Sequence, residues 1–408
     1  MYFQNLPYAN SKLQACIFKI SYLGAMSIIN RQLTTAIRSQ LQKYPILAVT
    51  GPRQSGKTTL LKHLFPEYEY VSLENTDLRS FAAEDPVGFL TTYDGQTIFD
   101  EVQRVPELFP YLQTKVDNQG IMGRYILSGS QNFHLLERIT QSLAGRVALF
   151  KLLPFDIQEL KSSNLLAEHW ETMLFRGFYP AIYDRGIEPS VFYANYLQTY
   201  LDRDVSQLTK VQDLRRFRNF VSLCAARTGQ LLNISALANS AGISQPTAKS
   251  WLTVLERSFI IFLLPPYFEN FSKRVVKSPK LYFFDPGLAA FLLGLRTLED
   301  LTDRTLAGAL FETLIISNII KQNHHTYQLR EYWFWRDAAG HEIDLLTQRG
   351  GSFDIFEVKA ARTLKPRLFK GLHDFAKISE GRVQSQTLIY GGADTQYRTD
   401  VTVVPWNH

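Results

Sequence analysis

The sequence contains little cysteine, no membrane-length apolar run and no strong excess of one charge. Its 2 cysteines, Cys16 and Cys224, stand far apart and in no ligand pattern, which argues against a disulfide framework and a cysteine-rich metal site. The best apolar run, Phe259-Ile-Ile-Phe-Leu-Leu264, stops at Pro265-Pro266, well short of the roughly 20 residues that span a bilayer. These absences predict a cytoplasmic protein that has no membrane partner.

The N-terminus also lacks a signal-peptide pattern, because Lys19 interrupts its only apolar stretch. Met26 is an alternative start, which would leave residues 1–25 as an extension without a functional role. Lysine and arginine total 44 against 38 acidic residues, so the net charge is +6 and the isoelectric point is near 9.1. This mild basicity is compatible with a nucleic-acid partner but does not require one.

The overall composition is that of a globular protein, with 45% hydrophobic and 20% charged residues. A chain of 408 residues is long enough for several domains, each with its own core. After the N-terminal extension we predict three of them, over residues 26–153, 154–290 and 291–408.

What the chain does carry is a phosphate-binding loop between a predicted strand, 46–50, and a predicted helix, 58–65. Its glycines let successive backbone N–H groups turn toward a phosphate, and the helix N-terminus adds partial positive charge. Lys57 is expected to reach the β- and γ-phosphates, and the Thr58 hydroxyl to ligate Mg²⁺. The motif predicts ATP and Mg²⁺ as cofactors, with a binding set of Gly51, Pro52, Arg53, Gln54, Ser55, Gly56, Lys57, Thr58 and Thr59.

An acidic pair, Asp100-Glu101, ends the short apolar strand that begins at Thr97. In a nucleotide site of this kind, Asp100 supports the Mg²⁺ shell, and Glu101 orients and deprotonates the attacking water. Strands that end in two solvated acids are common, but this one follows a P-loop. The pair therefore predicts hydrolysis of the nucleotide, with Glu101 as the catalytic base.

A third predicted strand ends in Ser128-Gly-Ser130, where a hydroxyl is expected to sense the γ-phosphate. The sequence does not separate the two serines, and Ser128 is taken as the candidate. Arg138 and Arg146 are candidates for an arginine finger that stabilises charge in the transition state. Arg146 is favoured, because the preceding Gly145 allows close approach.

Strands and helices alternate along the first predicted domain. This order predicts an α/β fold with a parallel sheet covered on both faces, and ligands bound at the carboxyl ends of the strands. The expected strands are 46–50, 70–73, 97–100, 125–128 and 147–152, and the expected helices are 58–65, 86–92, 108–118 and 131–139.

The middle of the chain predicts a helical lid over 154–210 followed by a helix-turn-helix. A short helix ends at Gly242, and Ser244 caps a second helix that runs to residue 257. Segments 259–264 and 280–284 are expected to supply the strands of a wing. DNA contact and use as an interaction module are equally compatible with this pattern, since Lys249 is the only basic residue early in the second helix.

The C-terminal part carries an Asp followed by Glu-x-Lys on two predicted strands: Asp344, Glu357 and Lys359. Glu312 lies on the apolar face of a predicted helix, 306–321, where a carboxylate is costly unless it is paired or metal-bound. Glu312, Asp344 and Glu357 are therefore candidate ligands of a divalent cation, and Lys359 a candidate catalytic residue. The alternative is a buried ion pair in a degenerate domain. Basic residues that would lie along phosphates follow: Arg362, Lys365, Arg367 and Lys370.

Three motifs together resemble the AAA+ branch of P-loop ATPases: Gly-Pro-Arg-Gln-Ser-Gly-Lys-Thr, Ile-Phe-Asp-Glu-Val-Gln and Ile-Leu-Ser-Gly-Ser. More closely, the chain is similar to a large group of bacterial and archaeal ATPases with an AAA-like core, a middle winged helix and a PD-(D/E)xK nuclease-like C-terminus. Ser142-Leu-Ala-Gly-Arg146 and Tyr200-Leu-Asp-Arg-Asp204 also look like that group. The resemblance covers the chain from Met26 onward. It implies ATP hydrolysis and allows a homo-oligomer.

Two hypotheses from different classes follow. The first is an ATPase that acts on nucleic acid, DNA foremost with RNA left open, and couples hydrolysis to DNA binding or to metal-dependent cleavage. The second is a nucleotide-switched regulatory protein whose winged helix and nuclease-like domain are docking modules. A small-molecule kinase is a weaker third, because it leaves the C-terminal half unexplained.

Overall fold

The computed structural model describes residues 28–130, 142–200, 214–268 and 277–408. Predictions that concern Cys16, Lys19, Met26, the helix 131–139, Arg138 and residues 201–204 lie outside these ranges. Within them, no helix combines the length and the apolar character needed to cross a membrane.

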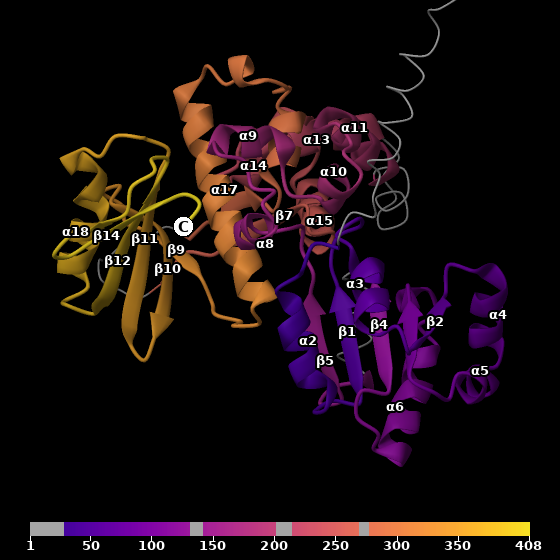
Figure 1. Cartoon of the computed structure of the whole chain (residues 1–408). Helices are drawn as coiled ribbons and strands as arrows, with labels where there is room; N and C mark the ends of the chain where they lie inside the picture. Colours follow the sequence, from indigo (N-terminus) through magenta and orange to yellow (C-terminus); the bar gives the residue numbers. More distant parts are fainter. Residues whose placement is uncertain (1–27, 131–141, 201–213, 269–276) are drawn as a thin grey trace, which may run out of the picture.

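The P-loop domain is a five-stranded parallel sheet with helices on both faces (Figure 1). The strand order is β2-β3-β4-β1-β5, so β4 lies between the strand that precedes the P-loop and the strand that ends in the acidic pair. This confirms the predicted parallel α/β sheet. The strands are β1 (Ile46–Thr50), β2 (Glu69–Ser72), β3 (Thr97–Asp100), β4 (Tyr125–Gly129) and β5 (Val147–Lys151).

Strand alternation distributes the apolar side chains of this sheet between two cores. Leu47 and Val49 pack in the core with α2 and α3, whereas Ile46 and Ala48 pack in the core with α5 and α6. Two helices were not predicted, and one of them, α4, buries only Ala82, which leaves little apolar periodicity to detect. The helices are α2 (Leu33–Leu41), α3 (Lys57–Leu64), α4 (Thr76–Glu84), α5 (Pro86–Thr92) and α6 (Leu108–Gln119), with a short 3-10 turn η1 (Val102–Arg104).

The middle of the chain is helical and contains a small antiparallel sheet of order β6-β8-β7. Gly242 ends α14 with a left-handed φ of 65°, and the Ser244 hydroxyl accepts a hydrogen bond from the Thr247 N–H at the start of α15. The elements are α8 (Ile157–Ser162), α9 (Trp170–Arg176), α10 (Pro180–Asp184), α11 (Pro189–Tyr200), α13 (Leu214–Ala225), β6 (Gln230–Leu231), α14 (Ile234–Ala241), α15 (Gln245–Arg257), β7 (Ile261–Leu264) and β8 (Lys280–Phe283).

The C-terminal part is a six-stranded mixed sheet of order β13-β14-β12-β11-β10-β9. Gly350 and Gly351, both with positive φ, turn β10 into its antiparallel partner β11. The long helix α17 stands between this sheet and the rest of the molecule (Figure 1). The elements are α16 (Pro286–Leu292), η3 (Leu298–Asp300), α17 (Arg304–His325), β9 (Trp333–Arg336), β10 (Glu342–Arg349), β11 (Ser352–Lys359), η4 (Pro366–Phe369), α18 (Lys370–Ile378), β12 (Val383–Tyr390), β13 (Gln396–Tyr397) and β14 (Thr402–Pro405).

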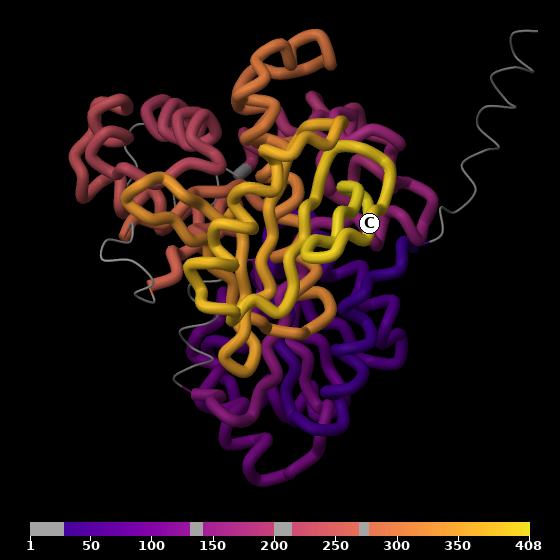
Figure 2. The backbone as a smooth tube through the Cα atoms, turned by 90° about the vertical axis from the view of Figure 1, so that its left-hand side faces the viewer, coloured from indigo at the N-terminus to yellow at the C-terminus, as the bar shows by residue number. Residues whose placement is uncertain are grey.

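The largest hydrophobic core crosses the boundary predicted between residues 290 and 291. It extends from Phe155 to Trp406 and includes Leu310 and Leu314 of α17 together with Val358 of β11. In Figure 2 the C-terminal sheet lies over the centre of the molecule, with the P-loop domain below it. The middle and C-terminal parts therefore share this core. The C-terminal sheet has a further core with α18, and the P-loop sheet has two cores of its own.

Candidate functional site

The P-loop approaches the end of β5 so closely that one position accepts only glycine. Gly51 has a φ of 152°, and a Cβ there would lie 2.1 Å from the Leu152 carbonyl oxygen. Further along the loop, Gln54 and Gly56 also adopt positive φ, of 60° and 90°. These angles turn the backbone sharply into α3, whose first residue is Lys57.

The side chains that were predicted to bind phosphate and Mg²⁺ gather at this turn. The Lys57 ammonium donates to the carbonyl oxygens of Gly51 and Pro52, at 3.0 and 2.8 Å. The Thr58 hydroxyl donates to Asp100 Oδ2 at 2.9 Å, and the Tyr70 hydroxyl donates to the same oxygen at 2.6 Å. A hydroxyl and a carboxylate in direct contact are hard oxygen donors of the kind Mg²⁺ prefers. Thr58 and Asp100 therefore fit the predicted Mg²⁺ role.

Glu101, the predicted base, has a left-handed backbone with a φ of 56°, an uncommon conformation for a non-glycine residue that concentrates at functional sites. Its Oε2 accepts from Gln103 Nε2 at 2.5 Å and from the Ser130 hydroxyl at 3.3 Å. Ser128, in contrast, is fully buried in β4, and its hydroxyl has no partner in the described chain. The structure thus places Ser130, rather than the candidate Ser128, beside Glu101.

A cavity of about 460 Å³ adjoins the P-loop and is walled on one side by α11, which belongs to the segment expected to form a helical lid. Tyr196 and Thr199 of α11 line it together with P-loop residues, Glu101 and Ser130. The Tyr196 hydroxyl accepts a hydrogen bond from that of Tyr179 at 2.9 Å, which fixes the wall. No local pattern distinguishes these two residues from an ordinary aromatic helix face, because only the fold brings α11 to the P-loop.

Arg146 does not lie at the P-loop of its own chain. It precedes β5, and its carbonyl accepts from the Ile46 N–H at the start of β1, so it is at the amino edge of the sheet. The P-loop lies at the opposite, carboxyl edge. The two edges are separated by the five residues of β1, which correspond to about 16 Å. Its guanidinium pairs with Asp117 of α6 through Nε, at 2.5 Å, and Nη2, at 2.8 Å. Arg146 is therefore too far away to act as a finger for the nucleotide of its own chain, and a role as a finger for a neighbouring copy stays a prediction.

A buried arginine that was not predicted supports the P-loop from behind. Arg31 is 5% exposed, and its Nη1 donates to the Ser55 carbonyl at 2.9 Å. Its other nitrogens donate to Glu159 Oε1 at 3.0 Å and to the Leu153 carbonyl at 2.6 Å. One guanidinium thus ties the P-loop to the chain that leaves β5 and to α8.

The same network reaches α17 through His325. The His325 Nε2 accepts from the Leu153 N–H at 3.3 Å, so its Nδ1 carries the proton and donates to Asp156 Oδ2 at 2.7 Å. Burial would raise the pKa of Asp156, but the contacts with His325 and the Glu159 N–H, together with the Lys321 charge, lower the pKa overall. Within the described chain, Asp156, Glu159 and His325 are the one group of three whose ligand atoms all lie within 4.8 Å of one another. Arg31 and backbone N–H groups already use these atoms, so the group does not fit a metal ion.

The predicted Asp344, Glu357 and Lys359 do meet on β10 and β11. The Lys359 Nζ lies 3.1 Å from Asp344 Oδ2 and 2.6 Å from Glu357 Oε1, and the Val358 N–H donates to Asp344 Oδ2 at 2.8 Å. Burial and the nearby Asp344 charge raise the pKa of Glu357 to about 8. Gly371 of α18 covers this carboxylate, because a Cβ there would lie 3.3 Å from Glu357 Oε2.

Glu312 is close to this group and forms the buried ion pair that was the alternative to a metal site, with Lys280 as its partner. Its Oε1 accepts from Lys280 Nζ at 3.0 Å and from the Tyr282 hydroxyl at 2.5 Å, both on β8. The same Nζ contacts Glu342 and lies 3.9 Å from Asp344 Oδ1. Two ammonium groups therefore stand among the carboxylates where a divalent cation was expected. As described, Glu312, Asp344 and Glu357 do not fit a metal ion.

Other predicted contacts lie on the surface. Lys249, Ser250 and Gln245 are exposed along the first turns of α15, whose opposite face is buried. The four basic residues that follow β11 are exposed too, and one of them, Arg362, pairs with Glu171 of α9 at 2.6 Å.

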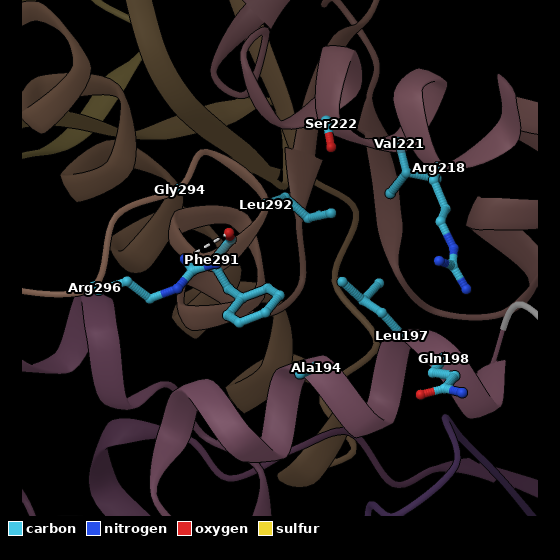
Figure 3. Close-up of a pocket in the computed structure, with 10 residues that line it drawn as sticks. All are labelled: Ala194, Leu197, Gln198, Arg218, Val221, Ser222, Phe291, Leu292, Gly294 and Arg296. Carbon is cyan, nitrogen blue, oxygen red and sulfur yellow. Dashed lines mark hydrogen bonds between the residues drawn. The ribbon is translucent and has the colours of Figure 1, made fainter. Parts of the chain in front are cut away.

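A second cavity, of about 510 Å³, lies between α11, α13 and the end of α16 (Figure 3). Arg296 stacks on the Phe291 ring, with its guanidinium carbon 3.8 Å from the ring centroid, and donates to the Phe291 carbonyl at 2.8 Å. Among the described residues, no acid, thiol or histidine lines this cavity, so the Ser222 hydroxyl has no base beside it there. Its lining is Ala194, Leu197, Gln198, Arg218, Val221, Ser222, Phe291, Leu292, Gly294 and Arg296.

Comparison with known families divides the chain into three matched regions. Residues 43–161 match an AAA domain, residues 167–299 a domain of unknown function (DUF8612) and residues 307–408 a second domain of unknown function (DUF4143). The AAA region contains the P-loop and the Asp100-Glu101 pair. It confirms the class predicted for the first domain.

Two mycobacterial proteins match most of the chain. Uncharacterized protein Rv2008c of Mycobacterium tuberculosis and uncharacterized protein Mb2031c of Mycobacterium bovis are each 31% identical over 369 residues, 89% of this chain and 80% of theirs. Among solved structures, the Walker-type ATPase PABY2304 of Pyrococcus abyssi matches with a TM-score of 0.42 and 15% identity. That match covers 65% of this chain and 96% of the other.

Proposed function

We propose, from the premise that this chain belongs to the family of the mycobacterial protein Rv2008c, that it is an ATPase whose hydrolysis cycle controls its binding to nucleic acid. The observation that carries the proposal is the convergence on one cavity of the P-loop and Glu101, beside the Thr58–Asp100 pair. Binding of a phosphate chain needs the P-loop, and hydrolysis needs Glu101.

The contacts in the cavity support a separate role for each of these residues. Lys57 would turn from the carbonyls of Gly51 and Pro52 to the β- and γ-phosphates, which offer a stronger charged acceptor. Thr58 and Asp100 would hold Mg²⁺, which supplies positive charge beside the phosphates when it is bound. Glu101 would accept a proton from the attacking water, while Gln103 and Ser130 hold its carboxylate in place.

Nucleic-acid binding is supported by the unit that runs from α13 to β8. Three helices and a three-stranded antiparallel sheet in this chain order are the parts of a winged helix, with α15 as the exposed second helix of the turn. Lys249 on α15 and Arg215 and Arg218 on α13 are exposed. DNA is the proposed partner, and RNA is a separate arm of the test.

Arg146 supports a further part of the proposal, an assembly of several copies. Because it lies at the edge of the sheet opposite its own P-loop, it can serve as an arginine finger only for a neighbouring copy. The proposed active form is thus a homo-oligomer in which Arg146 acts in trans.

The second candidate is a nucleotide-switched docking protein without cleavage activity. The observation that favours it over a metal-dependent nuclease is Lys280, whose ammonium lies among the C-terminal carboxylates in addition to the motif lysine, Lys359. No cleavage step is derived for this cluster.

The two candidates are separated by binding of labelled duplex DNA, single-stranded DNA and RNA over a salt series, with ATP, ADP or no nucleotide. The proposal expects affinity that falls with salt and changes with the nucleotide, and a salt slope about one charge smaller in Lys249→Ala. Lys43→Ala, an exposed lysine on the P-loop domain, is the matched control. If none of the nucleic acids binds in any nucleotide state, the docking protein remains as the candidate function. Plasmid incubated with Mn²⁺ should stay intact, and any nicking must be checked against Asp344→Ala.

A further inference from the structure

The C-terminal acidic cluster receives its deepest cation from another part of the chain. Lys280 is the first residue of β8, in the small sheet of the middle unit, and its side chain is 3% exposed. The carboxylates it meets lie on α17 and β10: Glu312 at 3.0 Å, Glu342 in direct contact, and Asp344 at 3.9 Å. A single ammonium therefore faces three carboxylates from two elements that are distant in sequence.

Two further cationic side chains reach the cluster, while Glu357 Oε2 is buried without a hydrogen-bond partner in the described chain. Lys359 contacts Asp344 at 3.1 Å and Glu357 at 2.6 Å, and Arg336 contacts Glu342 at 3.2 Å. The four carboxylates thus meet three cationic side chains, so the charge that would attract a metal ion is largely balanced within the protein. Carboxylates that bind Mg²⁺ or Mn²⁺ must place oxygens at about 2.0–2.2 Å from the ion. An ammonium in the same place prevents that approach.

We propose that Lys280 is a built-in cation that fills the acidic cluster and keeps divalent metal ions out of it while β8 is in its described position. The inference goes beyond the proposed function and does not depend on ATP hydrolysis, because the cluster lies in the C-terminal part. Its consequence is that metal binding at Asp344 requires removal of the Lys280 ammonium. If Lys280 only paired β8 with α17, removal of its charge would not create a cation site.

The test measures Mn²⁺ binding to the full-length, nucleotide-free protein. Binding is monitored through the loss of the EPR signal of free Mn²⁺. Lys280→Met removes the charge while keeping an unbranched side chain. Lys277→Met, an exposed lysine just before β8, is the matched control. Asp344→Asn is introduced into each background, so that binding at this cluster is separated from binding near Thr58 and Asp100.

The expected result is Asp344-dependent Mn²⁺ binding in Lys280→Met that is at least about tenfold tighter than in the wild type, and no gain in Lys277→Met. Wild-type protein that binds Mn²⁺ as tightly as Lys280→Met, with the loss of both on Asp344→Asn, would overturn the proposal. So would a folded Lys280→Met protein that gains no Mn²⁺ site.

Removal of a buried cation can also unfold the protein, and thermal melting will report this. In that case Lys280→Met is combined with Glu312→Gln, which removes one positive and one negative group and leaves Glu342, Asp344 and Glu357. The same gain of an Asp344-dependent Mn²⁺ site is expected in this charge-balanced variant. Its absence would contradict the proposal just as directly.

Discussion

At the scale of single residues, neighbouring acids at the P-loop are held for different tasks. Asp100 is fixed by hydroxyl donors from Thr58 and Tyr70, and its position suits a role in the Mg²⁺ shell. Glu101 has the strained backbone and faces the cavity. The difference arises from one turn of the chain, which sends adjacent carboxylates in different directions.

The role of Glu101 is tested by Glu101→Gln. The variant keeps the shape and the contacts of the side chain but cannot accept a proton, so ATP binding should persist while turnover falls about 10²–10⁴-fold. ATP affinity and phosphate release are measured on the same preparation. Lys57→Ala is the comparison, because it should abolish binding itself. Turnover at the wild-type rate in Glu101→Gln would remove this residue as the base.

His324, near the end of α17, predicts a loss of stability in acid. Burial, then the Lys151 charge, lowers its pKa from 6.5 in the unfolded chain to about 3 in the folded protein. The unfolded chain therefore binds the proton first, and stability falls as the pH drops from 6.5 toward 3. Between pH 8 and pH 5 this single group should cost about 2 kcal/mol.

The measurement is the free energy of unfolding in urea at both pH values. His324→Gln should lose about 2 kcal/mol less than the wild type between pH 8 and pH 5. His63→Gln, at an exposed histidine of α3, controls for the removal of any histidine. An equal pH dependence in wild type and His324→Gln would show that this residue is not the acid-sensitive group.

At the scale of elements, the nucleotide cavity depends on parts that lie far from the P-loop in sequence. α11 supplies one wall through Tyr196 and Thr199. Arg31, just before α2, supports the loop through Ser55 and is itself held by Glu159 of α8. The geometry of the P-loop is therefore set by the elements on either side of the domain as well as by its own glycines.

Arg31→Lys tests this support. Lysine keeps the charge but cannot bond Ser55, Leu153 and Glu159 together, because it lacks the planar fork of guanidinium. We expect ATP affinity to fall about tenfold and the melting temperature to drop, since breaking a buried ion pair costs about 3–5 kcal/mol. Arg38→Lys, on the exposed face of α2, is the matched control. Unchanged ATP affinity in a destabilised Arg31→Lys protein would limit Arg31 to a structural role.

At the scale of the whole molecule, α17 connects the C-terminal acidic cluster with the network behind the P-loop. Glu312 contacts the acidic cluster and His325 contacts the Arg31 network, and their 13-residue separation on one helix corresponds to about 20 Å. α17 also contributes Leu310 and Leu314 to the core shared by the middle and C-terminal parts. The helix is thus both a core element and a direct physical connection between the two polar sites.

The shared core predicts the result of cutting the chain. Division between residues 290 and 291 exposes the apolar face of α17 and leaves its partners uncovered. Neither residues 291–408 nor the middle unit of the other fragment should therefore fold alone, whereas the P-loop domain keeps its own cores. Each fragment is expressed separately, and then both together, with solubility and cooperative melting as readouts. Recovery of a soluble complex only on co-expression is expected. A residues 291–408 fragment that melts cooperatively by itself would contradict a shared core.

Local chemistry let much of the P-loop site be predicted. The β1–loop–α3 order, the strand Thr97–Asp100 and the acidic pair follow from nearby apolar and turn residues, because strand alternation and helix capping act over a few positions. The α15 bounds were predicted for the same reason, from Ser244 and Gly242. The strands that carry Asp344 and Glu357 were also predictable from alternation.

The sequence by itself therefore determined the P-loop and acidic-pair motifs and the segments that form the sheet. Only the tertiary structure decided that Ser130 faces Glu101, that Arg146 lies at the far edge and that Tyr196 walls the cavity. It also placed Lys280, 64 residues away from Asp344 in the chain, among the acids that resembled a metal site. Contacts of this kind leave no local periodicity, since they depend on how separate elements pack, and a charged partner from another element can change the chemistry of a motif.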